Sequence, residues 1–277
     1  MTLFTLATLN MEYGKRYRYP SIGPGSLLSQ SEPDIIFIQE SCPSKMTLSS
    51  NYQLLDFSNL NSSYNMDLSE RMDIYINNQS PWKLHHQFQI DTLPRKSPRQ
   101  SKIVVLVHNS TQKRLVVANV HLVGGRYDED DRQGGVLKSN LSTLRKLKIE
   151  ILEHLVSKYQ VDLIAGDFNS DLNCYLNKGI VASSQLSFFH KVSPGKSPNI
   201  YREWNLAPYN YLQSQGYQLA QRPIKNSEPV YTSIFKNHPD SIWFNPSRGH
   251  QKTYNILDFL SSNLSDHNGL QISLEII

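Results

Sequence analysis

Short apolar runs recur along the chain, separated by polar residues, glycine and proline. Runs of about four to eight apolar residues are typical of buried β-strands. Strands are therefore predicted at residues 3–9, 34–39, 72–76, 103–107, 115–122, 163–165, 241–244 and 270–276. This pattern favours a core built mainly from sheets.

One stretch, residues 139–159, has the period of an amphipathic helix. Its apolar residues recur at steps of three and four, which places them on one face of a helix. These apolar residues are Leu141, Leu144, Leu147, Ile151 and Leu155. The opposite, charged face holds Arg145, Lys146, Lys148 and Glu153. The helix is therefore expected to pack on a sheet through its apolar face.

A shorter helix is predicted at residues 26–30 and should end before Pro33, because the residue preceding a proline resists the helical region. The stretch from about residue 178 to residue 229 carries Gly, Pro, Asn and mixed aromatic residues without a clean period. It is interpreted as an irregular insertion within a single domain of residues 1–277, a length that one sheet-rich domain can reach.

The charge balance is mildly basic, with 28 Lys and Arg against 24 Asp and Glu and a formal net charge of +4. Such an excess favours an anionic partner without demanding nucleic acid. The two cysteines, Cys42 and Cys174, lack the spacing of metal-binding pairs. A disulfide framework is therefore not expected.

The opening segment MTLFTLATLN is apolar but lacks a basic leading region and a small-residue cleavage site. It is interpreted as the first strand rather than as a signal peptide. No run approaches the roughly 20 apolar residues needed to cross a bilayer. We therefore expect an intracellular protein without a membrane span, and a monomer is favoured.

Polar side chains, mostly carboxylates and amides, stand where several of the predicted strands end. They are Asn10, Glu40, Asn119, His121, Asp167, Asn169, Asp266 and His267. Any one of them alone is more often a turn residue than a functional one. Strand ends from different parts of a sheet can meet at one edge, so together these residues predict a single pocket.

The chemistry of these side chains favours one class of metal. Glu40, Asp266 and the amide of Asn10 are hard oxygen ligands suited to Mg²⁺, with Mn²⁺ as the alternative. The chain has no Cys and His set suited to zinc. His121 and His267 stand beside Asn119 and Asp266, where a neighbouring carboxylate would favour the charged, donating imidazole. A packed or surface histidine is the alternative interpretation of both.

Six short motifs make this arrangement recognisable. TLNMEYG, IQE, NVHL, GDFNS, DSIWF and SDHNGL occur in this order, from the motif that contains Asn10 to the one that ends at Leu270. In order and spacing they resemble the signature blocks of the endonuclease/exonuclease/phosphatase superfamily. The resemblance implies an α/β fold, a four-layer sandwich with two facing, mainly antiparallel sheets and outer helices. It also implies an active site at one end of the sandwich.

The resemblance further implies a role for each motif residue. Glu40 would be the principal metal ligand, with Asn10 beside it and Asp266 on the side of the metal and water. Asp167 would orient or deprotonate the attacking water, and Asn169 would bond the phosphorus oxygens. The remaining implied contacts are His267 with the phosphate, His121 with the phosphate and leaving group, and Asp240 as the carboxylate that props His267.

Three further segments carry open alternatives. After His121, the loop GGRYDEDDRQGG is either a solvated turn or lets Arg126 reach a substrate phosphate, and Arg126 and Asn119 are the substrate-binding candidates. A basic run, Arg95, Lys96, Arg99 and Lys102, and an aromatic stretch, Tyr201, Arg202, Trp204, Tyr209 and Tyr211, suit single-stranded nucleic acid. A solvated hairpin is the alternative for the basic run, and an ordinary insertion is the alternative for the aromatic stretch.

The segment SERMDIYINN lacks the glycine that the superfamily usually has there, so substrate contacts from that loop are not carried over.

These expectations together predict a magnesium-dependent phosphodiesterase that cleaves a phosphate ester by in-line attack of water. A nuclease acting on DNA or RNA is the favoured form. A phosphatase or phosphodiesterase acting on inositol phosphates or lipid headgroups is the alternative enzyme. A binding module that has lost catalysis is the alternative outside the enzymes.

Overall fold

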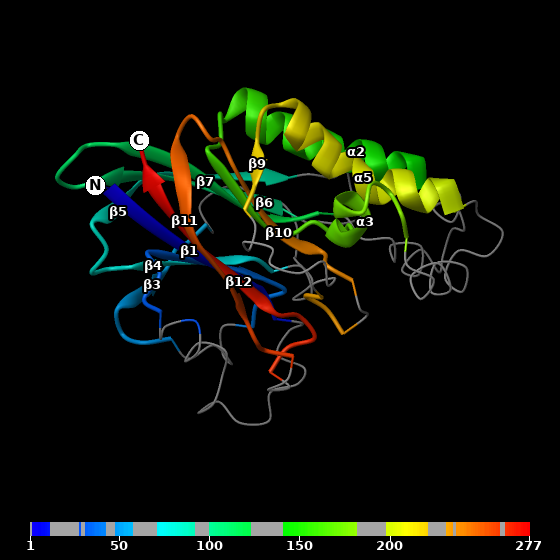
Figure 1. The fold of residues 1–277 in the computed structure, drawn as a ribbon. Coiled ribbons are helices and arrows are strands. Elements are labelled where there is room, and N and C mark those ends of the chain that lie inside the picture. Colours follow the sequence, from blue (N-terminus) through cyan, green and yellow to red (C-terminus); the bar gives the residue numbers. More distant parts are fainter. Residues whose placement is uncertain are drawn as a thin grey trace.

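The computed structural model describes residues 2–11, 28, 31–42, 48–57, 71–91, 100–122, 141–181, 198–220, 231–234, 237–260 and 264–277. Within them, two six-stranded sheets face each other, as Figure 1 shows. The first sheet has the order β11 (Gly249–Leu257), β12 (Gly269–Ile276), β1 (Thr2–Asn10), β2 (Ile35–Gln39), β4 (Asp73–Asn77), β3 (Tyr52–Leu54). The second has the order β5 (Trp82–Asp91), β6 (Gln100–His108), β7 (Arg114–His121), β8 (Leu163–Asp167), β10 (Asp240–Phe244), β9 (Gln218–Leu219).

Strand pairing in both sheets is mainly antiparallel. The parallel pairs are β1 with β2 and β7 with β8, one near the middle of each sheet. Every predicted strand is present, and the predicted α/β sandwich of two facing, mainly antiparallel sheets is confirmed.

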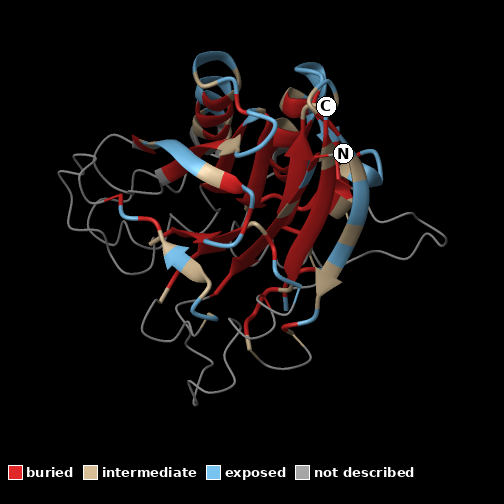
Figure 2. Ribbon diagram, turned by 90° about the vertical axis from the view of Figure 1, so that its left-hand side faces the viewer, coloured by how far each residue is buried: buried red, intermediate tan, exposed pale blue. Residues whose placement is uncertain are grey.

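The main core lies between the sheets and follows from the alternation of side chains along each strand. In β8, Leu163 and Ala165 face the other sheet, whereas Ile164 faces outward to the helices. The same alternation places Phe4 and Leu6 of β1 in the core between the sheets. Figure 2 shows the central strands of both sheets buried along their length. This inner face continues to the ends of the strands.

Helices cover the outer face of the second sheet. They are α2 (Leu141–Glu153), a π-helical turn η7 (His154–Lys158), α3 (Leu172–Leu176) and α5 (Pro198–Ser214). Ile151 and Leu155 pack with Ile164 and Trp243 of the sheet, which confirms the predicted packing of the amphipathic helix. Figure 1 shows α2 and α5 lying side by side above this sheet. None of the described helices is long and apolar enough to span a membrane.

The outer face of the first sheet forms a smaller apolar cluster. Met11, Leu28 and Phe259 cover Leu9 and Ile38 there. The helix predicted at 26–30 lies, apart from Leu28, outside the described residues.

The structure contains strands and a helix that the sequence pattern did not predict. Strand β11 is largely exposed and polar, and β5 exposes Leu84 and Phe88, so neither has the apolar run of a buried strand. Helix α5 runs through part of the stretch for which no regular element was predicted, and it continues through Pro208. Its proline and mixed aromatics obscured the helical period.

Candidate active site

The candidate site lies where inward-facing side chains reach the ends of strands from both sheets. Asn10 is the last residue of β1, and His121 and Asp167 end β7 and β8. His121 pairs with Asp167 in the parallel ladder, and Asp240 pairs with Asp167 in the antiparallel one. Because alternate residues face the same side, Asp167 continues the row of Leu163 and Ala165. The fold thus gathers these polar groups at one end of the core.

The two sheets meet at this end through direct polar contacts. Asn10 Nδ2 donates to Asp167 Oδ2 at 3.0 Å and lies 3.4 Å from Glu40 Oε1. His121 Nε2 lies 3.6 Å from Asp167 Oδ2 and 3.8 Å from Glu40 Oε1. Glu40 is the partly exposed member, with a side chain 20% accessible against 3% for Asp167. Glu40 is therefore the member of this cluster most open to solvent and to a ligand.

Two of these residues adopt left-handed backbone conformations. Glu40 has φ 47° immediately after β2, and Asn169 has φ 47° two residues after β8. This region is common for asparagine but costs free energy for glutamate, so the surrounding structure must hold it. The backbone of Glu40 thus departs from the extended conformation of β2 at the residue that joins the polar cluster.

The GDFNS segment is held tightly where it leaves β8. Gly166 has φ 138°, and a Cβ there would lie 2.1 Å from the carbonyl oxygen of Val120, so only glycine fits. The backbone N–H of Asn169 donates to Asp167 Oδ1 at 2.6 Å, and Asn169 Nδ2 donates to the carbonyl of Leu122 at 2.9 Å. The segment therefore fixes Asp167 and Asn169 relative to each other.

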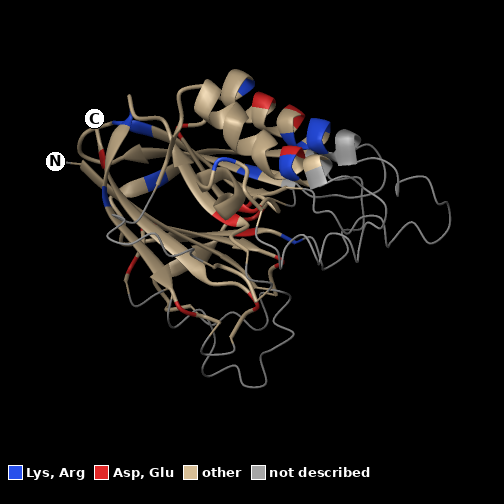
Figure 3. Cartoon of the chain, turned by 45° about the vertical axis from the view of Figure 1, so that its right-hand side comes forward, with Lys and Arg blue, Asp and Glu red and all other residues tan. Residues whose placement is uncertain are grey.

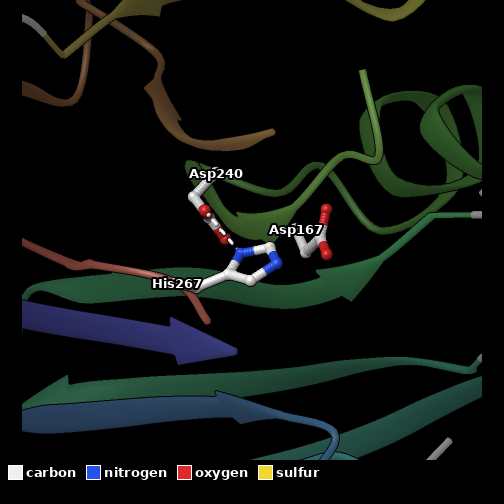
Figure 4. A group of neighbouring side chains, drawn as sticks. All are labelled: Asp167, Asp240 and His267. Atoms are coloured by element: carbon white, nitrogen blue, oxygen red, sulfur yellow. Dashed lines mark hydrogen bonds and ion pairs between the residues drawn. The ribbon is translucent and has the colours of Figure 1, made fainter. Parts of the chain in front are cut away.

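His267 and Asp240 form a buried ion pair, drawn in Figure 4. Nδ1 of His267 lies 2.8 Å from Asp240 Oδ2, and the other ring nitrogen is turned toward Asp167. Burial alone would lower the pKa of His267, but the charge and hydrogen bond of Asp240 outweigh it and raise that pKa to about 10. His267 is therefore a charged donor at neutral pH, with Nδ1 directed to Asp240.

Opposing effects act on the buried carboxylate of Asp167. Burial would raise its pKa, but the charges of His121 and His267, together with the Asn169 N–H and the Asn10 amide, lower it below the ordinary value. Asp167 is therefore ionised at neutral pH and is a hydrogen-bond acceptor.

The donor set fits a hard divalent cation. Asn10 and Glu40 supply amide and carboxylate oxygens, the ligands that Mg²⁺ and Mn²⁺ prefer. Asp266, the third predicted ligand, has its Oδ1 4.0 Å from Nε2 of His267. Ligand atoms of Asp167, Asp240 and His267 also lie within 4.8 Å of one another. However, Nδ1 of His267 is engaged by Asp240, and a charged imidazole repels a cation. The carboxylate side of Glu40 therefore fits a metal better than the histidine side.

Asn119, a predicted substrate-binding residue, is fully buried beneath the site. Its amide donates to the carbonyls of Ile38 and Asp73, at 3.2 and 3.1 Å, and its oxygen accepts from Gln39 Nε2 at 2.6 Å. Gln39 also donates to Thr8 Oγ1 at 3.0 Å. This position does not fit a substrate contact, and we propose instead that Asn119 holds strands of both sheets together. Gln39 and Asn119 are both fully buried and form this polar layer.

The other predicted substrate contacts lie partly outside the described residues and partly on β6 and α5. Of those on α5, Arg202 is exposed and Tyr211 is half-buried. Arg126, with Arg95, Lys96 and Arg99, lies outside the described residues. Tyr201, Trp204 and Tyr209 are buried on α5, so these three aromatic residues form part of the core rather than a platform for stacking bases. Lys102 is also buried and donates to the carbonyl of Met72 at 2.5 Å. The interpretation of these four side chains as nucleic-acid contacts is therefore wrong.

The charged residues of α2 do not all lie on a solvent face. Figure 3 shows basic and acidic positions along the outer helices. Lys146 is exposed, but Lys148, which was predicted on the same charged face, is fully buried. Its ammonium donates to the carbonyl of Asn169, at 2.8 Å, within the GDFNS segment. No sequence pattern identified this contact, because it depends on how α2 packs against the segment that follows β8.

Comparisons with known proteins concern the fold of the chain. No protein-family model matches the sequence, and no curated protein matches it. Solved structures do match over nearly the whole chain. The human Nocturnin catalytic domain with a bound sulfate anion is 15% identical, with a TM-score of 0.61, and the match covers 99% of this chain and 94% of that one.

Two bacterial structures match with somewhat lower TM-scores. An endonuclease/exonuclease/phosphatase from Bacteroides vulgatus is 12% identical, with a TM-score of 0.59 and full coverage of both chains, 100% each. A mannosyl-6-phosphatase from Bacteroides thetaiotaomicron is 13% identical, with a TM-score of 0.54 and 99% coverage of each chain. At these identities the likeness concerns the fold. The chain has the fold of the endonuclease/exonuclease/phosphatase superfamily.

Proposed function

We propose that the chain is a divalent-metal-dependent phosphoesterase that cleaves a phosphodiester by in-line attack of water. The observation that carries this proposal is the convergence of Asn10, Glu40, His121, Asp167 and the Asp240–His267 pair at one end of the sandwich. Attack on a phosphodiester needs a carboxylate for the water and hydrogen-bond donors for the oxygens that gain charge. The cluster supplies both.

Asp167 is the residue that we assign to the water. Its carboxylate is ionised, and one of its oxygens is held by the Asn169 N–H at 2.6 Å. A lowered pKa makes it a modest base, so it orients the water and accepts the proton as the bond to phosphorus forms. Asn10, at 3.0 Å, holds the second oxygen.

His267 is the residue that we assign to the charge on the phosphate. Its pKa of about 10 keeps it protonated at neutral pH, and Asp240 occupies only its Nδ1. The Nε2–H can then donate to a phosphate oxygen in the transition state. His121, at the end of β7 beside Asp167, is assigned to the leaving group, and the amide of Asn169 to a further phosphate oxygen.

Glu40, Asn10 and Asp266 are the residues that would hold the metal. When bound, Mg²⁺ or Mn²⁺ would neutralise charge on the phosphate and favour ionisation of the water. This assignment is supported by the oxygen-rich donor set and by the partial exposure of Glu40.

Nucleic acid is the substrate class that we favour. The net charge of +4 suits a polyanion, and the superfamily name covers nucleases as well as phosphatases. A mannosyl-6-phosphatase has the same fold, so phosphate monoesters and lipid headgroups are the alternative substrate class.

A substrate panel tests the proposal. Purified protein is given single-stranded DNA, duplex DNA, RNA, a 5′-phosphotyrosyl oligonucleotide, inositol phosphates and sphingomyelin, each with Mg²⁺ or with EDTA. We expect hydrolysis of a nucleic acid with Mg²⁺ and its loss in EDTA. Cleavage of the inositol phosphates or sphingomyelin alone would replace nucleic acid by the rival substrates. No hydrolysis of any substrate, with metal restored, would favour a binding module instead.

A further inference from the structure

Lys148 of α2 is a buried lysine that faces the catalytic segment. Its side chain is fully buried, and its Nζ donates to the Asn169 carbonyl at 2.8 Å and to Ser170 Oγ at 2.7 Å. Burying an ammonium costs folding free energy unless the protein provides hydrogen-bond acceptors and negative charge around it. A lysine is therefore kept here at a cost to stability, at the back of the GDFNS segment.

Trp204 of α5 supplies part of the compensation. The Lys148 ammonium lies 3.6 Å from the centre of the Trp204 ring, and Trp204 is 8% exposed. A cation over the face of a buried indole is stabilised more strongly than at an exposed site. Trp204 thus also holds the ammonium in place.

Helix α5 also holds the next two residues of the segment. Tyr209 OH donates to the Ser170 carbonyl at 2.5 Å, and Asn205 Oδ1 accepts from the backbone N–H of Asp171 at 2.6 Å. Together with Lys148, these contacts hold three successive residues, 169–171, from α2 and α5. The backbone that presents Asn169 is therefore fixed from behind by two helices.

Asn169 is the residue whose orientation depends on these contacts. It has φ 47°, its N–H donates to Asp167 Oδ1, and its side-chain amide donates to the Leu122 carbonyl. If the Asn169 carbonyl moved, the peptide segment that orients the Asn169 side-chain amide and the Asp167 carboxylate would move with it. Small misplacements of groups at a reacting centre can cost large factors in rate.

We propose that Lys148 is a positioning residue of the active site. Its ammonium, held over Trp204, fixes the Asn169 carbonyl and Ser170 hydroxyl and so orients Asn169 and Asp167. This inference rests on the proposed phosphoesterase activity for its kinetic consequence, but its structural consequence can be measured without any substrate.

The kinetic test compares Lys148→Met, which keeps the length and apolar stem, with Lys148→Arg and with Lys146→Met, an exposed control on the same helix. We expect Lys148→Met to lower kcat about 10-fold or more while KM and the Mg²⁺ requirement change little, because orientation rather than binding is lost. Lys148→Arg should restore part of kcat. Lys146→Met should leave kcat unchanged.

The structural test is amide hydrogen exchange of the metal-free proteins. In Lys148→Met we expect faster exchange of the amides of residues 168–171 and unchanged exchange in β1 and β6. Trp204→Leu, which leaves the lysine in place, should show the same pattern with a smaller fall in kcat, and it carries the test if Lys148→Met does not fold.

The outcomes separate the two claims. A wild-type protein without phosphoesterase activity would contradict the proposed function and leave exchange to decide the positioning role. Unchanged exchange at 168–171, or an unchanged kcat in an active enzyme, would overturn the positioning role. A loss of protection spread equally over β1 and β6 would also overturn it, because Lys148 would then only stabilise the fold.

Discussion

The Asn10 amide lies 3.0 Å from the Asp167 carboxylate, although 157 residues separate them in the chain. Asn10 ends β1 of the first sheet, and Asp167 ends β8 of the second. This hydrogen bond joins the two sheets at the end where the polar cluster lies. It also stabilises the ionised form of Asp167, which is the form that can hold a water.

Replacement of Glu40 by glutamine tests the metal assignment. Glu40→Gln exchanges a hard anionic oxygen for a neutral one, so Mg²⁺ should bind more weakly and activity should need more metal. A magnesium titration of kcat should show a half-saturating concentration raised about 10-fold or more, because loss of even an outer partner of a metal ligand typically costs about 10- to 100-fold in metal affinity. Saturating metal should restore part of the rate. An unchanged titration curve would place the metal elsewhere.

Replacement of Asp240 by asparagine tests the pair with His267. Asp240 raises the pKa of His267 to about 10, so Asp240→Asn should lower that pKa toward or below its ordinary value of 6.5. A protonated His267 is lost as pH rises through its pKa, so the variant should lose turnover at a lower pH than the wild type. A pH–rate profile at saturating Mg²⁺ measures this. Coincident alkaline limbs would exclude Asp240 as the partner that sets the charge of His267.

Lys102 gives the free energy of unfolding a specific dependence on pH. Burial lowers the pKa of Lys102 from 10.5 to about 8, with Asp73 opposing the change. The folded protein therefore binds this proton more weakly than the unfolded chain. Below pH 8 the free energy of unfolding is lowered by the whole of this difference. This lowering disappears as pH rises from about 8 toward 10.5.

The wild type should thus gain stability relative to Lys102→Met between pH 8 and pH 10. The gain is at most about 1.4 kcal/mol per pH unit, the value for one proton. Urea denaturation of both proteins across this range measures it, with Lys83→Met as the control because Lys83 bonds the Asn78 carbonyl at the surface. A constant difference between wild type and Lys102→Met would mean that Lys102 is not buried in the charged form.

The strand ends of the site were predictable because their signal is local. An apolar run that ends at Asp167 or Glu40 indicates both the strand and the polar side chain at its end. The alternation of side chains along the strand then indicates which face of the sheet that side chain lies on. The superfamily motifs added the order of these ends. They could not show which groups contact one another, since the 3.0 Å contact of Asn10 with Asp167 depends on the packing of two sheets.

The burial of Lys148 was not predictable for a related reason. An amphipathic pattern assigns one buried stripe to a helix that packs on a single surface. Helix α2 packs on the sheet and also contacts α5, so Lys148 lies against Trp204 although the pattern placed it on the charged face. Asn119 shows the same limit, because a polar residue inside a strand gives no sign of whether it faces a ligand or a buried amide such as Gln39.

The central claim is that Asp167 prepares the water that attacks phosphorus, and Asp167→Asn tests it most directly. The matched control is Asp162→Asn at the opposite end of β8, a buried carboxylate that accepts from the Val116 N–H at 2.8 Å and from Arg248. The measurement is kcat of the three proteins on the preferred substrate at saturating Mg²⁺. We predict that Asp167→Asn loses on the order of 10²-fold or more, whereas Asp162→Asn keeps nearly the full rate once folded. Retention of more than half of the wild-type rate by Asp167→Asn would contradict the claim.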